Sequence, residues 1–212
     1  MPMPPALPDH AASGEPLDDH DARAWLYVLV ADGHEDLLKV GLTRRPLARW
    51  SAFHPRWYEA FDLRHSLLVG CETRGDAQRL ETALHRELAE LRCPMPLSVR
   101  AAAGGASEWY RGAYARVRRF VEDCAQRGHP VQRDAAAFLA PAMRAQAERL
   151  DALLREAHAG LMDGWLNPAQ CRALVDLVDG HCRFDTDLAA RLPQPAWQDL
   201  RRAHARAATL AA

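Results

Sequence analysis

Residues 39–49 read Lys-Val-Gly-Leu-Thr-Arg-Arg-Pro-Leu-Ala-Arg, and this stretch decides how the first half of the chain is expected to fold. It follows the continuous apolar run of residues 25–30 and the polar turn of residues 31–36, which contains Asp-Gly. Two apolar segments joined by an Asp-Gly turn are typical of a β-hairpin. Pro46 suits the first turn of a following helix, and Thr43 is its candidate cap. The stretch therefore predicts a hairpin followed by a short helix.

Further along, the pattern predicts one more strand and two amphipathic helices. Residues 63–69, which end in the apolar run Leu-Leu-Val, are expected to form a third strand. Leucines recur in steps of three and four over residues 75–91, which predicts a long helix with one apolar face. Residues 92–107 are expected to form a loop, and residues 114–126 a second helix. The predicted class is α+β, with a small three-stranded antiparallel sheet flanked by helices.

The C-terminal part of the chain has a different character. It is rich in Ala, Leu and Arg and shows no strand pattern, which predicts an all-helical extension. One helix is expected over residues 142–157. Asn167, followed by a proline, should cap another helix that Gly180 ends, and a last helix should begin near Pro195.

Composition and charge limit the function classes. The chain has 212 residues, 49% of them hydrophobic, and no apolar run long enough to span a membrane. No secretory signal is visible, and the five cysteines have no close pairs, which predicts reduced thiols in the cytoplasm. Residues 1–20 are acidic and Pro-rich, as in a disordered tail. Residues 21–128 form the predicted first domain and residues 129–212 the helical extension. The first domain has 17 basic and 14 acidic side chains, which fits a phosphate-contacting face or an ordinary solvated surface.

A set of polar residues recurs at spacings that carry a family resemblance. Tyr27 lies in the first strand and Lys39-Val40-Gly41 in the second, and the short helix carries Thr43-x-x-Pro46-x-x-Arg49. The long helix carries Glu81 with His85 one turn later, and Glu108-Trp109-Tyr110 follows the loop. In this order the motifs resemble the GIY-YIG nuclease superfamily, in its phage- and bacteria-associated branch that has Lys-Ile-Gly in place of Tyr-Ile-Gly. The resemblance covers about residues 24–122.

The chain departs from that superfamily in two places. Lys39 replaces the second signature tyrosine, which leaves open the group that accepts the proton. The late asparagine of many members has no clear equivalent.

The resemblance implies a metal-dependent endonuclease that hydrolyses phosphodiester bonds in DNA. Glu81 would hold one Mg²⁺ or Mn²⁺, because such ions favour oxygen ligands and keep several waters. Arg49 would bind a non-bridging phosphate oxygen through its rigid guanidinium, and Arg45 is the competing arginine. A surface glutamate paired with a neighbouring arginine, and a solvated helix arginine, are the ordinary alternatives.

Three residues are candidates for proton transfer in this hypothesis. Tyr27 could orient or deprotonate the attacking water, or serve only as a core tyrosine with a satisfied hydroxyl. Lys39 is the single lysine among 27 basic residues and could act as base or phosphate clamp. His85 could accept a proton or orient Glu81. Trp109 could stack on a base, as Tyr110 could, or both could cap the core.

A non-catalytic module is the alternative function. In that case a GIY-YIG-like scaffold would bind nucleic acid or a protein, and Trp50 or Trp109 would fill the groove. The C-terminal helices would form a partner surface or a homodimer interface. A cleaving enzyme should instead bring Glu81 and Arg49 together.

Overall fold

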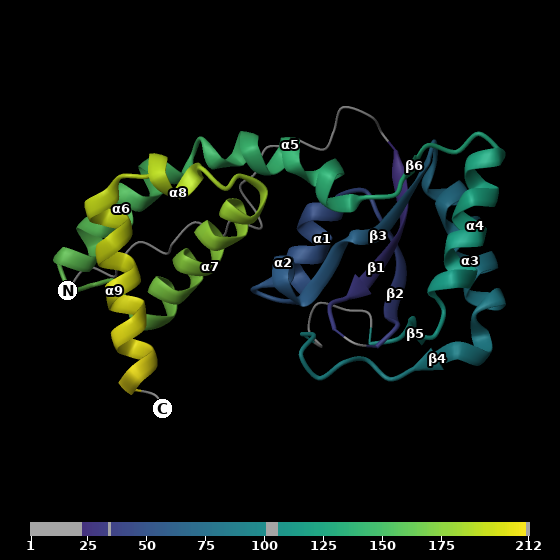
Figure 1. Cartoon of the computed structure of the whole chain (residues 1–212), viewed down its shortest axis with the longest axis horizontal. Helices are drawn as coiled ribbons and strands as arrows, with labels where there is room; N and C mark the ends of the chain where they lie inside the picture. The colour runs from purple at the N-terminus through teal and green to yellow at the C-terminus, as the bar shows by residue number, and fades with distance from the viewer. Residues whose placement is uncertain (1–22, 34, 101–105, 211–212) are drawn as a thin grey trace. The chain divides into compact units, whose positions relative to one another are not determined.

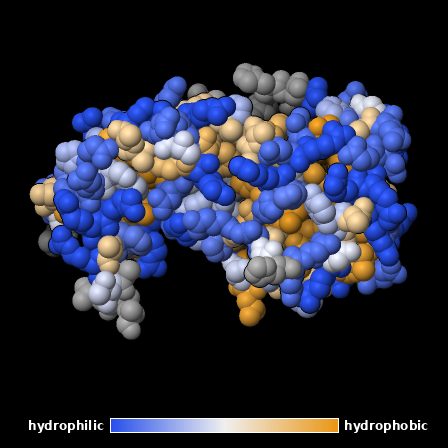
Figure 2. Space-filling model, viewed as in Figure 1, coloured by the Kyte–Doolittle hydropathy of each residue, from blue (hydrophilic) through white to orange (hydrophobic). Residues whose placement is uncertain are grey.

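The computed structural model describes residues 23–33, 35–100 and 106–210, so the tail predicted for residues 1–20 lies outside the described part (Figure 1). The chain divides between Leu139 and Ala140 into two compact units. The viewed surface of both units is mostly hydrophilic (Figure 2). In the described part, no helix has both the length and the apolar character needed to cross a membrane.

The first unit is built on a six-stranded antiparallel sheet (Figure 1). The strands, in the spatial order β4-β5-β2-β1-β3-β6, are β4 (Arg92–Cys93), β5 (Trp109–Arg111), β2 (Leu37–Thr43), β1 (Ala24–Ala31), β3 (Phe61–Cys71) and β6 (Val131–Gln132). The α+β class and the three central strands agree with the prediction, but the predicted number of strands was wrong. Strands of two or three residues are too short to show alternation, so the sequence did not reveal β4, β5 and β6.

Helices cover both faces of this sheet (Figure 1). On one side lie α1 (Pro46–Phe53) and α2 (Trp57–Ala60), and on the other α3 (Arg74–Glu87) and α4 (Tyr114–Gln126). Successive strand residues point to opposite faces. The apolar side chains beneath α3 and α4 form one core, which includes Leu26, Val28, Leu38, Val40, Leu84, Val117 and Val121. Tyr27, Lys39 and Gly41 alternate with these residues and face the other way.

The helix ends follow local sequence signals. Helix α1 begins at Pro46 as predicted, but Thr43 does not cap it; the Thr43 hydroxyl accepts a hydrogen bond from the Arg45 amide (3.0 Å) in the preceding turn. Helix α3 begins with a capping box, in which Thr73 and Asp76 bond to each other's backbone amides. This cap fixes where α3 starts and therefore which of its residues face the sheet.

The second unit contains helices only, among its described residues. They are the end of α5 (Ala135–Ala147), then α6 (Leu150–Met162), α7 (Pro168–Phe184), α8 (Leu188–Arg191) and α9 (Gln194–Leu210). Asn167 caps α7 as predicted. The single helix expected over residues 142–157 is divided between α5 and α6. Gly180 does not end α7, which continues to Phe184; the glycine is buried in the core together with the other inward residues of this helix.

Candidate active site

The residues predicted to act together meet where strand β5, the second strand from one edge of the sheet, begins. Strand β5 pairs with only the first three residues of β2, so that Lys39 lies opposite Trp109. Glu108 immediately precedes β5, and its carbonyl accepts a hydrogen bond from the Val40 amide (3.1 Å). On the other side of β2, Tyr27 of β1 lies opposite Gly41. The sheet register thus places Tyr27, Lys39 and Glu108 in one region.

Tyr27 is held between the sheet and α1. Its side chain is almost fully buried, and its ring packs edge-on against Trp50 at 6.1 Å between ring centroids. Burial raises the pKa of Tyr27 to about 12, although a hydrogen bond from Arg49 and the charge of that guanidinium act in the opposite direction. Arg49 also stacks over Phe53, with its guanidinium carbon 4.6 Å from the ring centroid. Arg49 therefore sits beside the tyrosine hydroxyl, where its charge can reach a bound anion.

Lys39 has no exposed surface. Its Nζ donates to the Ser107 carbonyl (3.0 Å) and to Glu108 Oε2 (3.3 Å), and it lies 5.7 Å from the centroid of the Trp109 ring. Burial lowers the pKa of Lys39, while the neighbouring Glu108 carboxylate opposes that shift. A buried amine normally needs such partners, because transfer of a charge out of water is costly.

Glu81, His85 and Glu108 form a potential metal-binding cluster. One ligand atom from each lies within 4.8 Å of the others. His85 Nε2 is 3.8 Å from Glu81 Oε1 and also 3.8 Å from Glu108 Oε1. Nε2 is buried and has no hydrogen-bond partner, which is unusual for a buried polar atom. Two carboxylates and an unpartnered imidazole nitrogen suit a divalent cation.

Neighbouring side chains hold these groups in place. The Gln78 amide donates to Glu81 Oε2 (2.6 Å), and the Tyr110 hydroxyl bonds to His85 Nδ1 (2.6 Å). Both the Glu81 and His85 side chains are largely shielded from water, with exposed fractions of 9% and 14%. The pair therefore lies at the edge of the buried face of α3, one helical turn apart.

Glu108 has an uncommon backbone conformation. Its φ is +75°, and among the described residues it is the only one other than glycine with a positive φ. That conformation costs an L-residue on the order of 1–2 kcal/mol. Strained residues persist where the surroundings hold them, and they are concentrated at functional sites.

Two residues predicted to contact substrate lie in different surroundings. Arg45 is exposed at the start of α1 and is accessible to a ligand. Trp109 has no exposed surface and lies beside Lys39, so it has no free face on which a base could stack. Tyr110 is likewise buried. Gln78 was not predicted to belong to the site, although its position one turn before Glu81 on the same helix was a usable signal.

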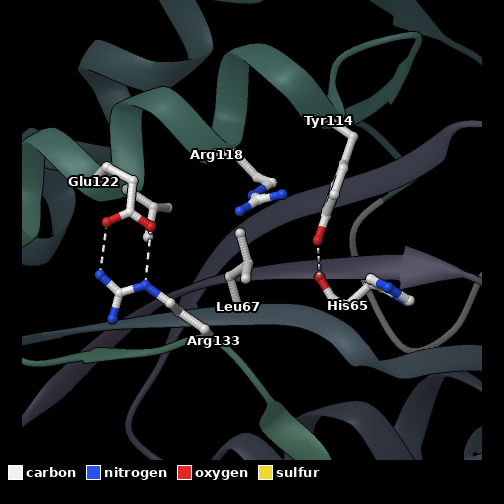
Figure 3. Close-up of a pocket in the computed structure, with 7 residues that line it drawn as sticks. His65, Leu67, Tyr114, Arg118, Glu122 and Arg133 are labelled. Atoms are coloured by element: carbon white, nitrogen blue, oxygen red, sulfur yellow. Dashed lines mark hydrogen bonds and ion pairs between the residues drawn. The ribbon is translucent and has the colours of Figure 1, made fainter.

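A separate pocket of about 170 Å³ lies between α4 and β3 (Figure 3). Tyr114 crosses it to donate to the His65 carbonyl (3.0 Å), and Arg133 makes a two-pronged ion pair with Glu122 (2.9 and 2.6 Å). Its lining residues are not those of the Glu81 cluster. The Arg133 charge is therefore matched by Glu122, while Arg118 also lines the pocket.

The segment that contains this site is similar to a known domain. Residues 24–125 match the T5orf172 domain. The T5orf172 match includes every residue of the Glu81 cluster and ends inside α4, before the second unit. No curated protein and no solved structure gives a significant match to the chain.

Proposed function

We propose that the T5orf172 domain of this chain is a metal-dependent endonuclease that hydrolyses phosphodiester bonds in DNA. One observation carries the proposal: the free ligand atoms of Glu81, His85 and Glu108 face one another beside Tyr27 and Arg49. Hydrolysis of a phosphodiester needs a cation, a phosphate-binding group and a proton acceptor. T5orf172 domains occur in phage-associated and endonuclease-like proteins, which supports the same activity.

Within this proposal, the domain is a GIY-YIG nuclease of the branch with Lys-Ile-Gly. The support is that Tyr27, from the first signature, lies opposite Gly41, from the second, and contacts Arg49 of the next helix. Glu81 holds a single Mg²⁺ or Mn²⁺. The ion, when bound, stabilises the negative charge that develops on the phosphate oxygens.

Arg49 and Arg45 take the substrate phosphates in this scheme. Arg49 is half-buried and held by Phe53 and Tyr27, so its guanidinium is already oriented before DNA binds. Arg45 is exposed and one turn earlier, which suits a contact to a flanking phosphate.

Tyr27, Lys39 and His85 can exchange a proton with the attacking water. With a pKa of about 12 when no ion is bound, Tyr27 remains protonated at neutral pH. In that state its hydroxyl can orient the attacking water. Lys39 and His85 are the other candidate proton acceptors: burial lowers the pKa of Lys39, and His85 Nε2 has no hydrogen-bond partner. The scheme needs only one of them.

Plasmid nicking tests the function. Wild-type protein and Glu81→Gln and Arg49→Ala variants are incubated with supercoiled DNA and Mg²⁺ or Mn²⁺, with Arg118→Ala as a matched control from the exposed face of α4. We expect nicking by wild type and control, and a loss of about 10²–10³-fold for Arg49→Ala. Equal nicking by all four proteins would mean a contaminating nuclease.

A second candidate function is a non-catalytic binding module. The favouring observation is that Lys39, Trp50 and Trp109 all have no exposed surface, as expected of a groove filled by side chains. Binding of DNA in a gel-shift assay, without nicking in either metal ion, would select this function.

The second unit supplies a protein-binding surface or a homodimer interface in either scheme. Met162, at the end of α6, is 70% exposed although it is a large apolar residue. Sedimentation velocity of the full chain tests this part of the proposal. Wild-type protein and the Met162→Glu variant are compared over a range of concentrations. If both are monomers throughout, the result argues against a homodimer.

A further inference from the structure

The three groups of the Glu81 cluster share one geometric property. Each side chain has two ligand atoms, of which a neighbour occupies one and the other faces the common centre. For Glu81, Oε2 is held by Gln78 and Oε1 faces inward. For His85, Nδ1 is held by Tyr110 and Nε2 faces inward.

Glu108 completes the pattern. Its Oε2 is held by Lys39 Nζ at 3.3 Å, and its Oε1 lies 3.8 Å from His85 Nε2. The three holding residues come from different elements: Gln78 from α3, Tyr110 from β5 and Lys39 from β2. An arrangement in which every ligand is oriented by a further hydrogen bond is characteristic of protein metal sites.

From this arrangement we infer that the site binds its ion through all three side chains and selects a first-row transition ion such as Mn²⁺ over Mg²⁺. The inference rests on the proposed nuclease function, since it names the ion for that site. Mg²⁺ prefers oxygen ligands and retains most of its waters, so a single carboxylate suffices for it. An imidazole ligand adds affinity for transition ions and little for Mg²⁺.

The inference also gives Lys39 a positioning role. Lys39 touches the outer oxygen of Glu108 and would orient the inner one toward the ion. In this role it does not contact the reacting atoms, so it is no longer a candidate proton acceptor. Glu108 needs such a partner, because its side chain is 36% exposed and its own backbone has the strained positive φ. The lysine that replaces the second signature tyrosine is thereby assigned to metal binding.

Metal binding without DNA tests the inference. Full-length protein stripped by a chelator is titrated with Mn²⁺, and the free ion is followed by electron paramagnetic resonance, with Mg²⁺ as competitor. We expect one Mn²⁺ per chain, bound at least tenfold more tightly than Mg²⁺. His85→Gln should weaken Mn²⁺ by about 10–100-fold and change Mg²⁺ by less than threefold.

The positioning residues need their own variants. Tyr110→Phe and Lys39→Met keep the side-chain volume and should each weaken Mn²⁺ by about tenfold or more. His65→Gln is the matched control, because His65 pairs with the Asp62 carboxylate (2.6 Å) in the same unit but outside the cluster. Circular dichroism and thermal melts establish that each variant is folded. Should a variant fail to fold, Glu108→Gln, which removes one charge only, replaces it.

Two results would overturn the inference: Mg²⁺ binding as tightly as Mn²⁺, or unchanged Mn²⁺ affinity in folded His85→Gln protein. The second result would make His85 a proton acceptor instead of a ligand if nicking were lost. Failure of the nuclease proposal looks different, since Mn²⁺ would bind selectively while no DNA is nicked in any ion.

Discussion

Tyr27 and Gly41 are directly opposed in the β1–β2 ladder, and a β-carbon at residue 41 would lie 2.5 Å from the Tyr27 hydroxyl oxygen. It would also lie 2.7 Å from the ring carbon that bears this hydroxyl. Atoms cannot approach so closely, so residue 41 must be glycine for the tyrosine to lie across it. The glycine of the second signature therefore fixes the position of the tyrosine of the first.

Gly41→Ala should consequently displace Tyr27 and impair the site. We expect the free energy of unfolding to fall by about 1–3 kcal/mol, as for overpacking in a dense core, and nicking to fall with it. Urea denaturation and the plasmid assay measure the two effects. Gly75→Ala is the control, because its added β-carbon would meet nothing closer than 3.6 Å. Wild-type stability and nicking in Gly41→Ala would show that the close approach is unimportant.

Lys39→Met should separate stability from activity. Methionine removes a buried amine but leaves Glu108 partly exposed to water, so no charge is stranded in the core. We expect the free energy of unfolding to stay equal or rise by about 1 kcal/mol, whereas nicking falls. Denaturation at pH 7 gives the first quantity. A large loss of stability would instead mean that the lysine is mainly a structural element.

The difference in free energy of unfolding between wild type and Lys39→Met should depend on pH through the pKa of Lys39. In the folded protein this pKa lies below the ordinary value of 10.5, so the native state loses the proton first as pH rises. Wild-type stability should then increase relative to Lys39→Met from the folded-state pKa up to about pH 10.5. Denaturation series at several pH values test this. If the free energy of unfolding of Lys39→Met rose relative to that of wild type over this pH range, the result would contradict the burial of the amine.

Much of the site was predictable because it depends on short-range periodicity. The Asp-Gly segment indicates the hairpin, and the register of that hairpin brings Tyr27 opposite Gly41. The one-turn spacing of Glu81 and His85 puts both on one helix edge. These relations involve neighbours along a strand or helix, which a sequence shows directly.

Other features depend on contacts distant in sequence. The pairing of Lys39 with Glu108 spans 69 residues, and it requires β5, a strand too short to show a pattern. The full burial of Trp109 follows from the same pairing. In the second unit, no glycine or proline marks the break at residues 148–149 between α5 and α6. Packing decides these features.

Tyr27→Phe should lower the sensitivity of the fold to alkaline pH. The folded-state pKa of about 12 lies above the ordinary 10.0, so stability is fully present below pH 10 and declines between pH 10 and 12. The decline has an upper limit of about 1.4 kcal/mol per pH unit for this one group. Denaturation at pH 9, 10 and 11 compares the variant with wild type, and parallel curves would show that the hydroxyl is better hydrated than its burial indicates.

Gly160→Ala tests the core of the second unit. A β-carbon on Gly160 of α6 would lie 2.6 Å from the Trp165 ring, so the ring must move or the helix must shift. We expect a loss of about 1–3 kcal/mol, read by the tryptophan fluorescence of urea denaturation. Because Gly160 and the Glu81 cluster lie in different compact units, Mn²⁺ affinity should stay within twofold of wild type. A parallel loss of Mn²⁺ binding would show that the two units fold as one cooperative body, and the nuclease site would then depend on the helical extension for its stability.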